Sequence, residues 1–319
     1  MEITFWGVRG SIASPGADTA AVGGNTSCVE VRCGTSRIVL DAGTGARKLG
    51  DRFLAEGTVE ATILLSHLHW DHIQGLPFFV PAYLPSTRLS ILGSAHGAAT
   101  LGEALAHQMS APNFPVRFDE LGAQITMREV RHGESFAVGK ATVKVAKLNH
   151  PGSVFAYRIE HEGRSIVYAT DTEHYACVDP TLCALAEGAD VLIYDAQYTP
   201  EEYRGEVTVS GGATAVLGQP PKAARSKVGW GHSTYLAGAE LAQGAGVGQL
   251  ILFHHDPQRT DAGVAEIERR AKELFGQTTA AREGMKLELS PVSSPHASRR
   301  FEDGDAERRT SAHVESRAA

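Results

Sequence analysis

Short runs of hydrophobic residues alternate along this chain with turn residues, and their lengths are typical of β-strands. Residues 61–66 (ATILLS) form one apolar run, which leads directly into a cluster of histidines. The other predicted strands have similar lengths and lie at 3–8, 27–33, 37–43, 88–93, 124–130, 141–148, 155–160, 165–170, 191–194 and 249–253. Chemistry at the carboxyl end of a strand is the usual arrangement in α/β folds.

Helical spacing of apolar residues occurs at 98–109, 233–242 and 262–275. Pro112 and Pro115 follow the first segment, and Val264, Ile267 and Ala271 mark one face of the last. With 319 residues, of which 42% are hydrophobic, the chain is long enough for one large α/β domain. Strands before and after the middle of the chain would form the two halves of a sandwich.

The composition changes near residue 295 to Arg, Glu, Asp, Ser and Ala, with few residues to bury. We therefore expect one domain over residues 1–292 and a disordered tail over 293–319. A second unusual stretch, the Gly/Pro-rich segment 205–224, is either a mobile rim over a site or a tolerated surface insertion.

The formal charge of −7 argues against a protein that holds long nucleic acid on a basic face. A small anionic substrate remains compatible, because bound metals would add positive charge. The N-terminus lacks the pattern of a signal peptide, and no run reaches the roughly 18 apolar residues of a membrane helix, so we expect a cytoplasmic protein without a membrane partner. Cys28 and Cys33 would point to opposite faces of one strand and would not share an ion.

The stretch SHLHWDHIQG at residues 66–75 holds three histidines and one aspartate within six positions. A single histidine is usually a surface or hydrogen-bonded core residue, but this clustering indicates metal binding, since neutral imidazole is the commonest metal ligand. On an extended segment His67, His69 and Asp71 would share a face, while His72 would approach from another angle. Two directions indicate two ions, and four side chains are too few to coordinate both.

Further ligands would have to come from other strand ends, and three residues meet that requirement. His150 follows the strand 141–148, Asp171 follows 165–170, and His254 follows 249–253. Any one of them alone could be a turn residue. His255 and Asp256 are alternatives to His254 at this point.

The spacing H-x-H-x-D-H, with these strand-end residues, resembles the metallo-β-lactamase superfamily over residues 3–290. That resemblance implies an α/β fold of the four-layer αββα sandwich type and two Zn²⁺ ions, with Mn²⁺ as an alternative. Histidine at position 69, where the flavin/di-iron branch carries glutamate, favours hydrolysis over redox chemistry. Carried over residue by residue, one metal would be held by His67, His69 and His150, the other by Asp71, His72 and His254, with Asp171 bridging both.

Two more segments, GWGHST at 229–234 and IYDAQ at 193–197, are similar to motifs of the phosphodiesterase branch that contains ribonuclease Z. By that resemblance His232 would stabilise phosphate charge or protonate the leaving oxygen, and Asp195 would fix the tautomer of the His232 ring. The alternative interpretation is that Ser233 caps the following helix and His232 lies in a loop.

The resulting hypothesis is a dinuclear metal-dependent phosphodiesterase, in which hydroxide formed at the metals attacks phosphorus and Asp71 accepts a proton from water. Only 20 residues separate His150 from Asp171, which leaves no space for the tRNA-gripping arm of ribonuclease Z, so a cyclic nucleotide or short nucleotide diester is expected. An ester, thioester or lactone hydrolase, and a non-catalytic metal-stabilised binding module, are the alternatives. By analogy with phosphodiesterase relatives, a homodimer is also expected.

Overall fold

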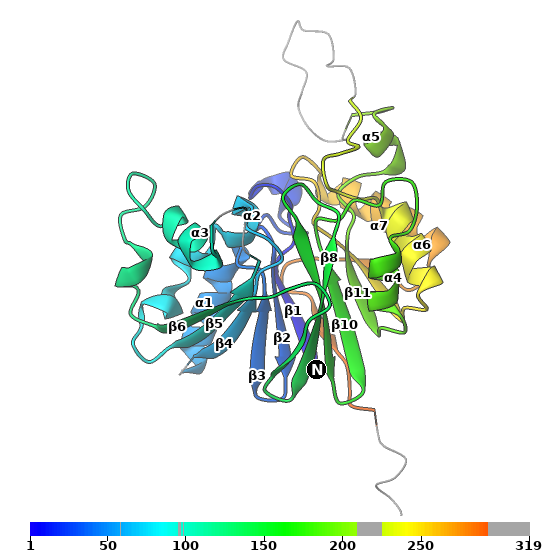
Figure 1. Ribbon diagram of the computed structural model, residues 1–319. Helices are drawn as coiled ribbons and strands as arrows, with labels where there is room; N and C mark the ends of the chain where they lie inside the picture. The colour runs from blue at the N-terminus through cyan, green and yellow to red at the C-terminus, as the bar shows by residue number, and fades with distance from the viewer. Residues whose placement is uncertain (58, 95–96, 98, 209–224, 293–319) are drawn as a thin grey trace, which may run out of the picture.

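Two seven-stranded β-sheets pack face to face, and helices cover the outer surface of each sheet (Figure 1). The computed structural model describes residues 1–57, 59–94, 97, 99–208 and 225–292. Helices α1 and α3 lie outside the first sheet, and α4, α6 and α7 lie outside the second. The predicted four-layer αββα sandwich is therefore confirmed.

The first sheet is built mainly from the N-terminal half of the chain. In spatial order its strands are β14 (Lys286–Glu288), β1 (Glu2–Gly7), β2 (Cys28–Cys33), β3 (Ser36–Leu40), β4 (Glu60–Leu64), β5 (Arg88–Gly93) and β6 (Gln124–Glu129). Neighbouring strands from β3 to β6 are parallel. Their carboxyl ends therefore lie along one edge of the sheet, where the segment after β4 begins the histidine cluster.

The second sheet contains the strands that precede the other candidate ligands. In spatial order these are β13 (Thr278–Ala280), β12 (Gln249–Phe253), β11 (Val191–Asp195), β10 (Arg164–Ala169), β9 (Val154–His161), β8 (Ala141–Leu148) and β7 (Ser135–Val138). Strands β10 to β13 are parallel, whereas β7, β8, β9 and β10 pair antiparallel.

Helices connect the parallel strands. They are α1 (Gly45–Glu56), α2 (Trp70–Ile73), α3 (Leu101–Gln108), α4 (Pro180–Ala186), α5 (Pro200–Arg204), α6 (Tyr235–Gly244) and α7 (Asp261–Leu274), with 3₁₀ turns at Ala17–Thr19, Leu76–Phe78, Val80–Tyr83 and Phe118–Glu120. None of the helices within the described residues is long and apolar enough to cross a membrane.

Side-chain hydrogen bonds at the helix N-termini explain where the predicted helices begin. Thr100 caps α3 in a capping box with Glu103, so this helix starts later than the apolar spacing suggests. Thr234 caps α6 by accepting a hydrogen bond from the backbone N–H of Ala237. The interpretation of Ser233 as the cap is therefore wrong, because the helix begins one residue later than that interpretation requires.

The pattern analysis did not predict α1, although one face of this helix is buried through Ala46, Leu49 and Phe53. Its first turn has no side-chain cap, which removes a local signal for its start. Of the Gly/Pro-rich segment 205–224, residues 209–224 lie outside the described residues, as does the proposed tail 293–319.

Alternating side chains of β2 divide between two hydrophobic clusters. Val29, Val31 and Cys33 belong to the larger cluster that includes the space between the sheets, whereas Cys28 belongs to the cluster formed with α1 and α3. The two cysteines therefore lie on opposite faces of the strand, as the period of two predicts. Both are free thiols.

Candidate metal centre

The segment after β4 changes from extended backbone to helix within the histidine cluster. His69 is still extended, with φ −66° and ψ 152°, and α2 begins at Trp70. Extended alternation therefore stops before Asp71, and the prediction that His67, His69 and Asp71 share one face is wrong in this respect. Asp71 lies instead with His72, because both are residues of α2.

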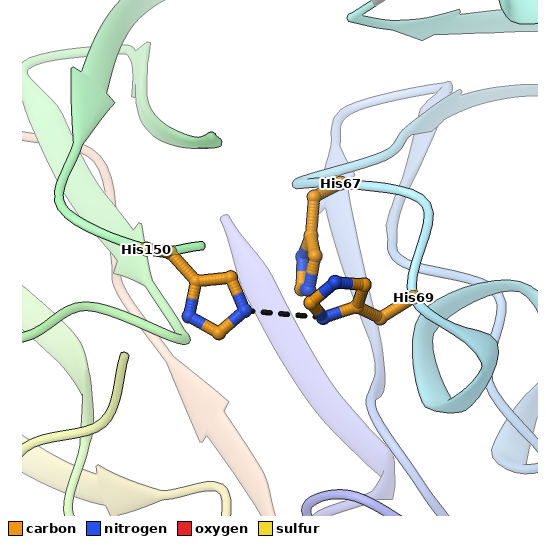
Figure 2. Close-up of side chains that lie close together, drawn as sticks. All are labelled: His67, His69 and His150. Atoms are coloured by element: carbon orange, nitrogen blue, oxygen red, sulfur yellow. Dashed lines mark hydrogen bonds between the residues drawn. The ribbon is translucent and has the colours of Figure 1, made fainter. Parts of the chain in front are cut away.

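Three histidines form the first group of side chains. His67 and His69 come from the loop after β4, and His150 follows β8 in the opposite sheet (Figure 2). One ring nitrogen of each lies within 4.8 Å of the others, and His150 Nε2 is 3.1 Å from His69 Nδ1. Burial lowers the pKa of all three imidazoles, which favours the neutral form that binds a cation.

Two carboxylates and two histidines form the second group, which comprises Asp71, His72, Asp171 and His254. All four are buried. Asp71 Oδ2 lies 3.1 Å from both His72 Nε2 and His254 Nε2. Burial raises the pKa of Asp71, but the neighbouring His72 and His254 outweigh it and hold that pKa far below its usual range.

Asp171 lies between the two groups and faces each with a different oxygen. Its Oδ1 is 3.2 Å from His72 Nε2 and 3.1 Å from His254 Nε2. Its Oδ2 is 3.7 Å from His67 Nε2 and 3.9 Å from His150 Nε2. This is the placement that a carboxylate bridging two cations would require.

Left-handed backbone occurs just after three strands, at the candidate ligands Asp171 and His254 and at Asp41, which lies beside His72. Asp41, Asp171 and His254 have φ values of 59°, 50° and 60° respectively. Non-glycine residues seldom adopt this conformation, although Asp and His tolerate it better than most, and such residues often occur at functional sites. The sharp turn after each strand sends the side chain toward the space between the two sheets' edges.

Two ring nitrogens indicate that the groups fit metal ions. His67 Nε2 and His72 Nε2 are buried and form no hydrogen bond with any residue that the structure describes. For His72 this holds although carboxylate oxygens of Asp71 and Asp171 lie at 3.1 and 3.2 Å. Buried imidazole nitrogens normally have a partner, and a cation among neutral histidines and ionised aspartates would supply it.

The opposite ring nitrogens of the histidines have hydrogen-bond partners that set their orientation. His72 Nδ1 lies 2.7 Å from Asp41 Oδ2, His254 Nδ1 lies 2.9 Å from Gln197 Oε1, and His150 Nδ1 lies 2.8 Å from the carbonyl oxygen of Gly231. Each contact leaves Nε2 free for a ligand. The sequence analysis did not assign Asp41, which lies within the predicted strand 37–43, or Gln197, which follows the predicted strand 191–194.

His232 and Asp195 lie beside the second group. His232 Nδ1 is 2.9 Å from Asp195 Oδ2 and 3.9 Å from Asp171 Oδ2. Burial lowers the pKa of His232, but the charge of Asp195 and its hydrogen bond outweigh this effect and raise the pKa to about 9. Asp195 therefore favours the protonated form of the imidazole.

Glu173 anchors the loop that carries His232, and the sequence analysis did not assign it a role. Its carboxylate accepts hydrogen bonds from the backbone N–H groups of Gly229 at 2.7 Å and Gly231 at 2.9 Å, and from the hydroxyl of Tyr203 at 2.6 Å. Gly231 has φ +86°, and a Cβ there would lie 2.1 Å from His150 Nδ1. Glu173 therefore holds the loop closely against the first histidine group.

Of the two consecutive histidines after β12, only His254 lies in the cluster. His255 turns away, and its Nε2 bonds to the carbonyl oxygen of Ala281 at 3.0 Å. Residue 10 must be glycine for His254 to fit, because a Cβ at Gly10 would lie 2.4 Å from the His254 ring.

The centre opens to solvent through a cavity of about 460 Å³. A ligand in this cavity would meet both metal-ligand groups and His232. The cavity is lined by Ser11, Leu68, His69, Trp70, Asp71, Asp171 and His232. Its size falls within the range of roughly 300–1,000 Å³ typical of small-molecule sites.

Known proteins resemble this chain in sequence and in fold. A ribonuclease Z from Mycobacterium sp. (strain KMS) is 28% identical over 292 residues, covering 86% of this chain and 91% of the relative. The metallo-β-lactamase fold protein YhfI from Bacillus subtilis has a TM-score of 0.62 at 19% identity, covering 90% of this chain and 99% of that protein. The short form of human tRNase Z has a TM-score of 0.61 at 19% identity, covering 91% and 100%.

The family model of the β-lactamase superfamily domain matches residues 36–255, which is more than half of the chain. This match begins at β3 and ends just after His254, so it contains every candidate metal ligand. The chain therefore belongs to the metallo-β-lactamase superfamily.

Proposed function

We propose that this protein is a dinuclear metal-dependent phosphodiesterase that acts on a small phosphodiester. The observation that carries the proposal is the His232–Asp195 pair, which lies next to the two ligand groups and lines the cavity through His232. Relatives named ribonuclease Z support hydrolysis of phosphodiesters. A solved structure named as a diphosphatase of the PhnP family shares the fold, with a TM-score of 0.60.

In this proposal the metals would be Zn²⁺, with Mn²⁺ as the alternative. One metal would be held by His67, His69 and His150. The other would be held by Asp71, His72 and His254, and Asp171 would contact both metals. When bound, such ions lower the pKa of water toward about 7 and neutralise charge on phosphoryl oxygens. Zinc sites have roughly four ligands each. These side chains would provide most of the ligands for two such sites, and solvent would complete each coordination shell.

The side chains around the cavity have complementary roles in phosphodiester hydrolysis. Ionised Asp71 is positioned to accept a proton from the attacking water, and its Oδ2 is held by the backbone N–H of Ser11 at 2.7 Å. His232, protonated and oriented by Asp195, donates a proton to the leaving oxygen or stabilises phosphate charge. This arrangement requires no nucleophilic serine or cysteine.

A small substrate fits the structure better than a tRNA precursor. The 20 residues between His150 and Asp171 are used almost entirely by the hairpin of β9 and β10. No additional arm emerges from this described segment. The net charge of −7 also gives no general attraction to long nucleic acid.

Turnover of bis(p-nitrophenyl) phosphate, measured beside thioester and lactone panels with added Zn²⁺ or Mn²⁺, tests the proposal. We expect metal-dependent release of p-nitrophenol and little activity on the acyl substrates. Activity on lactones or thioesters alone would contradict a phosphodiesterase. Two bound metals with no turnover of any substrate would favour the binding-module alternative.

A further inference from the structure

A second cavity adjoins the metal centre on the side of α3. Its volume is also about 460 Å³, and Leu68, His69 and Trp70 line both cavities. The walls farther from the metal centre are formed by Ile73, by Ala99 just before α3, and by α3 itself. The lining residues of α3 are Glu103, Ala104, His107 and Gln108. A ligand bound at the metal centre could therefore extend into this second cavity.

Trp70 lines both cavities and is unusually exposed. It stands between the candidate ligands His69 and Asp71, yet its side chain is 78% exposed. The backbone beneath it is ordered, because the N–H of Gln74 donates to the carbonyl oxygen of Trp70 at 2.7 Å. An exposed indole on a fixed backbone is a flat apolar surface beside the site, and large exposed aromatic groups often mark binding surfaces.

The second cavity lacks Asp71, Asp171 and His232, which line the cavity at the metal centre. Its described lining residues contain no lysine or arginine, and Glu103 and His107 are exposed at its edge. Leu68, Ile73, Ala99 and Ala104 provide aliphatic surface. A phosphate would therefore gain little here, whereas the uncharged planar part of a phosphate ester would be removed from water and could stack on the indole.

We propose that this second cavity, the Trp70 cavity, is a subsite for the nucleobase of a nucleotide ester whose phosphate lies at the metal centre. The inference rests on the proposed phosphodiesterase function and names its substrate class. Aromatic stacking on Trp70 tolerates any base, because every base has a π-face. The helix wall limits the space beside the ring, and Gln108 Nε2 fixes that wall by donating to the carbonyl oxygen of Ile73 at 2.9 Å.

Two substrates with the same leaving group test the subsite. The p-nitrophenyl ester of thymidine 5′-monophosphate carries a base, whereas ethyl p-nitrophenyl phosphate does not. We expect wild-type kcat/KM to be at least about tenfold higher for the nucleotide ester, which corresponds to ~1.4 kcal/mol of differential stabilisation. Trp70→Ala should reduce this ratio about tenfold, with a smaller reduction in Trp70→Phe.

A second variant avoids the ligand segment. Ala104→Leu, on α3, would fill part of the Trp70 cavity while leaving every residue of the loop that carries His69 and Asp71 unchanged, and should also lower the ratio. Phe78→Ala is the matched control, because Phe78 is 53% exposed and lines neither cavity. Metal content is measured for every variant. A wild-type ratio near one, or a ratio unchanged in both Trp70→Ala and Ala104→Leu, would overturn the subsite while leaving the phosphodiesterase intact.

Ligand binding separates failure of the subsite from failure of the enzymatic proposal. Adenosine 5′-monophosphate should quench tryptophan fluorescence in the wild type but much less in Trp70→Phe, whereas inorganic phosphate should quench neither. If neither ester is hydrolysed, the phosphodiesterase proposal is contradicted. Trp70-dependent quenching would still support the nucleobase subsite in that case. Absence of quenching by adenosine 5′-monophosphate would then overturn the subsite as well.

Discussion

The carboxylate of Asp41 lies 2.7 Å from Nδ1 of His72, and both side chains are fully buried. Asp41 also accepts hydrogen bonds from the backbone N–H and hydroxyl of Ser66 and from the hydroxyl of Tyr168. One aspartate therefore connects the start of the histidine segment, the ring of a candidate ligand and the opposite sheet. We therefore expect Asp41 to influence metal affinity without being a ligand.

We expect Asp41→Asn to weaken metal binding by about 10- to 100-fold, because the amide removes the charge that orients and polarises His72. Metal stoichiometry after dialysis against graded chelator concentrations measures the effect. Asp51→Asn is the control, since Asp51 lies at the surface, 3.7 Å from Arg47. Equal metal retention by Asp41→Asn and wild type would contradict this role.

The Asp195–His232 pair predicts a specific pH dependence. If His232 acts as the proton donor, activity is present below its raised pKa of about 9 and falls as pH rises through that value. Asp195→Asn removes the main charge that raises the pKa, so the alkaline limit should move toward the ordinary histidine value of about 6.5. Measuring kcat against pH for both proteins tests this shift.

His232→Ala complements that experiment. Loss of a general acid typically lowers the rate by about 10²- to 10⁴-fold, while metal content should stay at the wild-type level. An alkaline limit that is identical in wild type and Asp195→Asn would show that another group controls the profile. Near-normal turnover in His232→Ala would contradict the catalytic role itself.

Glu173 should contribute to both stability and activity. In Glu173→Gln the side-chain amide group would replace one oxygen and place a donor opposite a backbone N–H of Gly229 or Gly231. Hydrogen bonds to charged groups contribute about 1.5–3 kcal/mol, so we expect a loss of roughly that size in urea unfolding. Turnover should fall as well, because the same loop carries His232.

Two further variants make the Glu173 experiment specific. Tyr203→Phe removes one of the three donors and should cause a smaller loss of stability. Glu187→Gln, an exposed position at the end of α4, should behave as wild type. If Glu173→Gln unfolds at the wild-type urea concentration and retains full activity, the loop is held by other contacts.

The four cysteines should differ widely in reactivity. Burial raises the pKa of Cys33 to about 11 and that of Cys28 well above its usual value, so both remain protonated at pH 8. Cys177 is exposed, and Cys183 is partly buried. With a thiol-specific disulfide reagent we expect Cys177 to react first, and Cys28 and Cys33 only after unfolding. Cys177→Ser should abolish the fast phase, and a single rate for all four thiols would contradict the prediction.

Much of the architecture could be predicted from local patterns. The strands β5, β8 and β12 have the bounds that the apolar runs predict, and His150, Asp171 and His254 each follow a strand in the second sheet. Strand periodicity and strand ends depend on neighbouring residues, so they are visible without a structure. The helix α1 was missed because its start lacks the capping side chain that normally marks a boundary.

The amino-acid sequence by itself determined which residue types occur at the strand ends, and hence a fold class and a set of candidate ligands. Residue spacing alone placed Asp71 with His67 and His69, and only the tertiary structure shows why Asp71 lies in the second group, as the resemblance implied: α2 begins at Trp70 and ends the extended alternation. It also shows His255 bonded away from the cluster, in agreement with the choice of His254, and it reveals Asp41, Gln197 and Glu173 as orienting partners. These contacts join segments far apart in the chain, and their geometry depends on how two sheets pack.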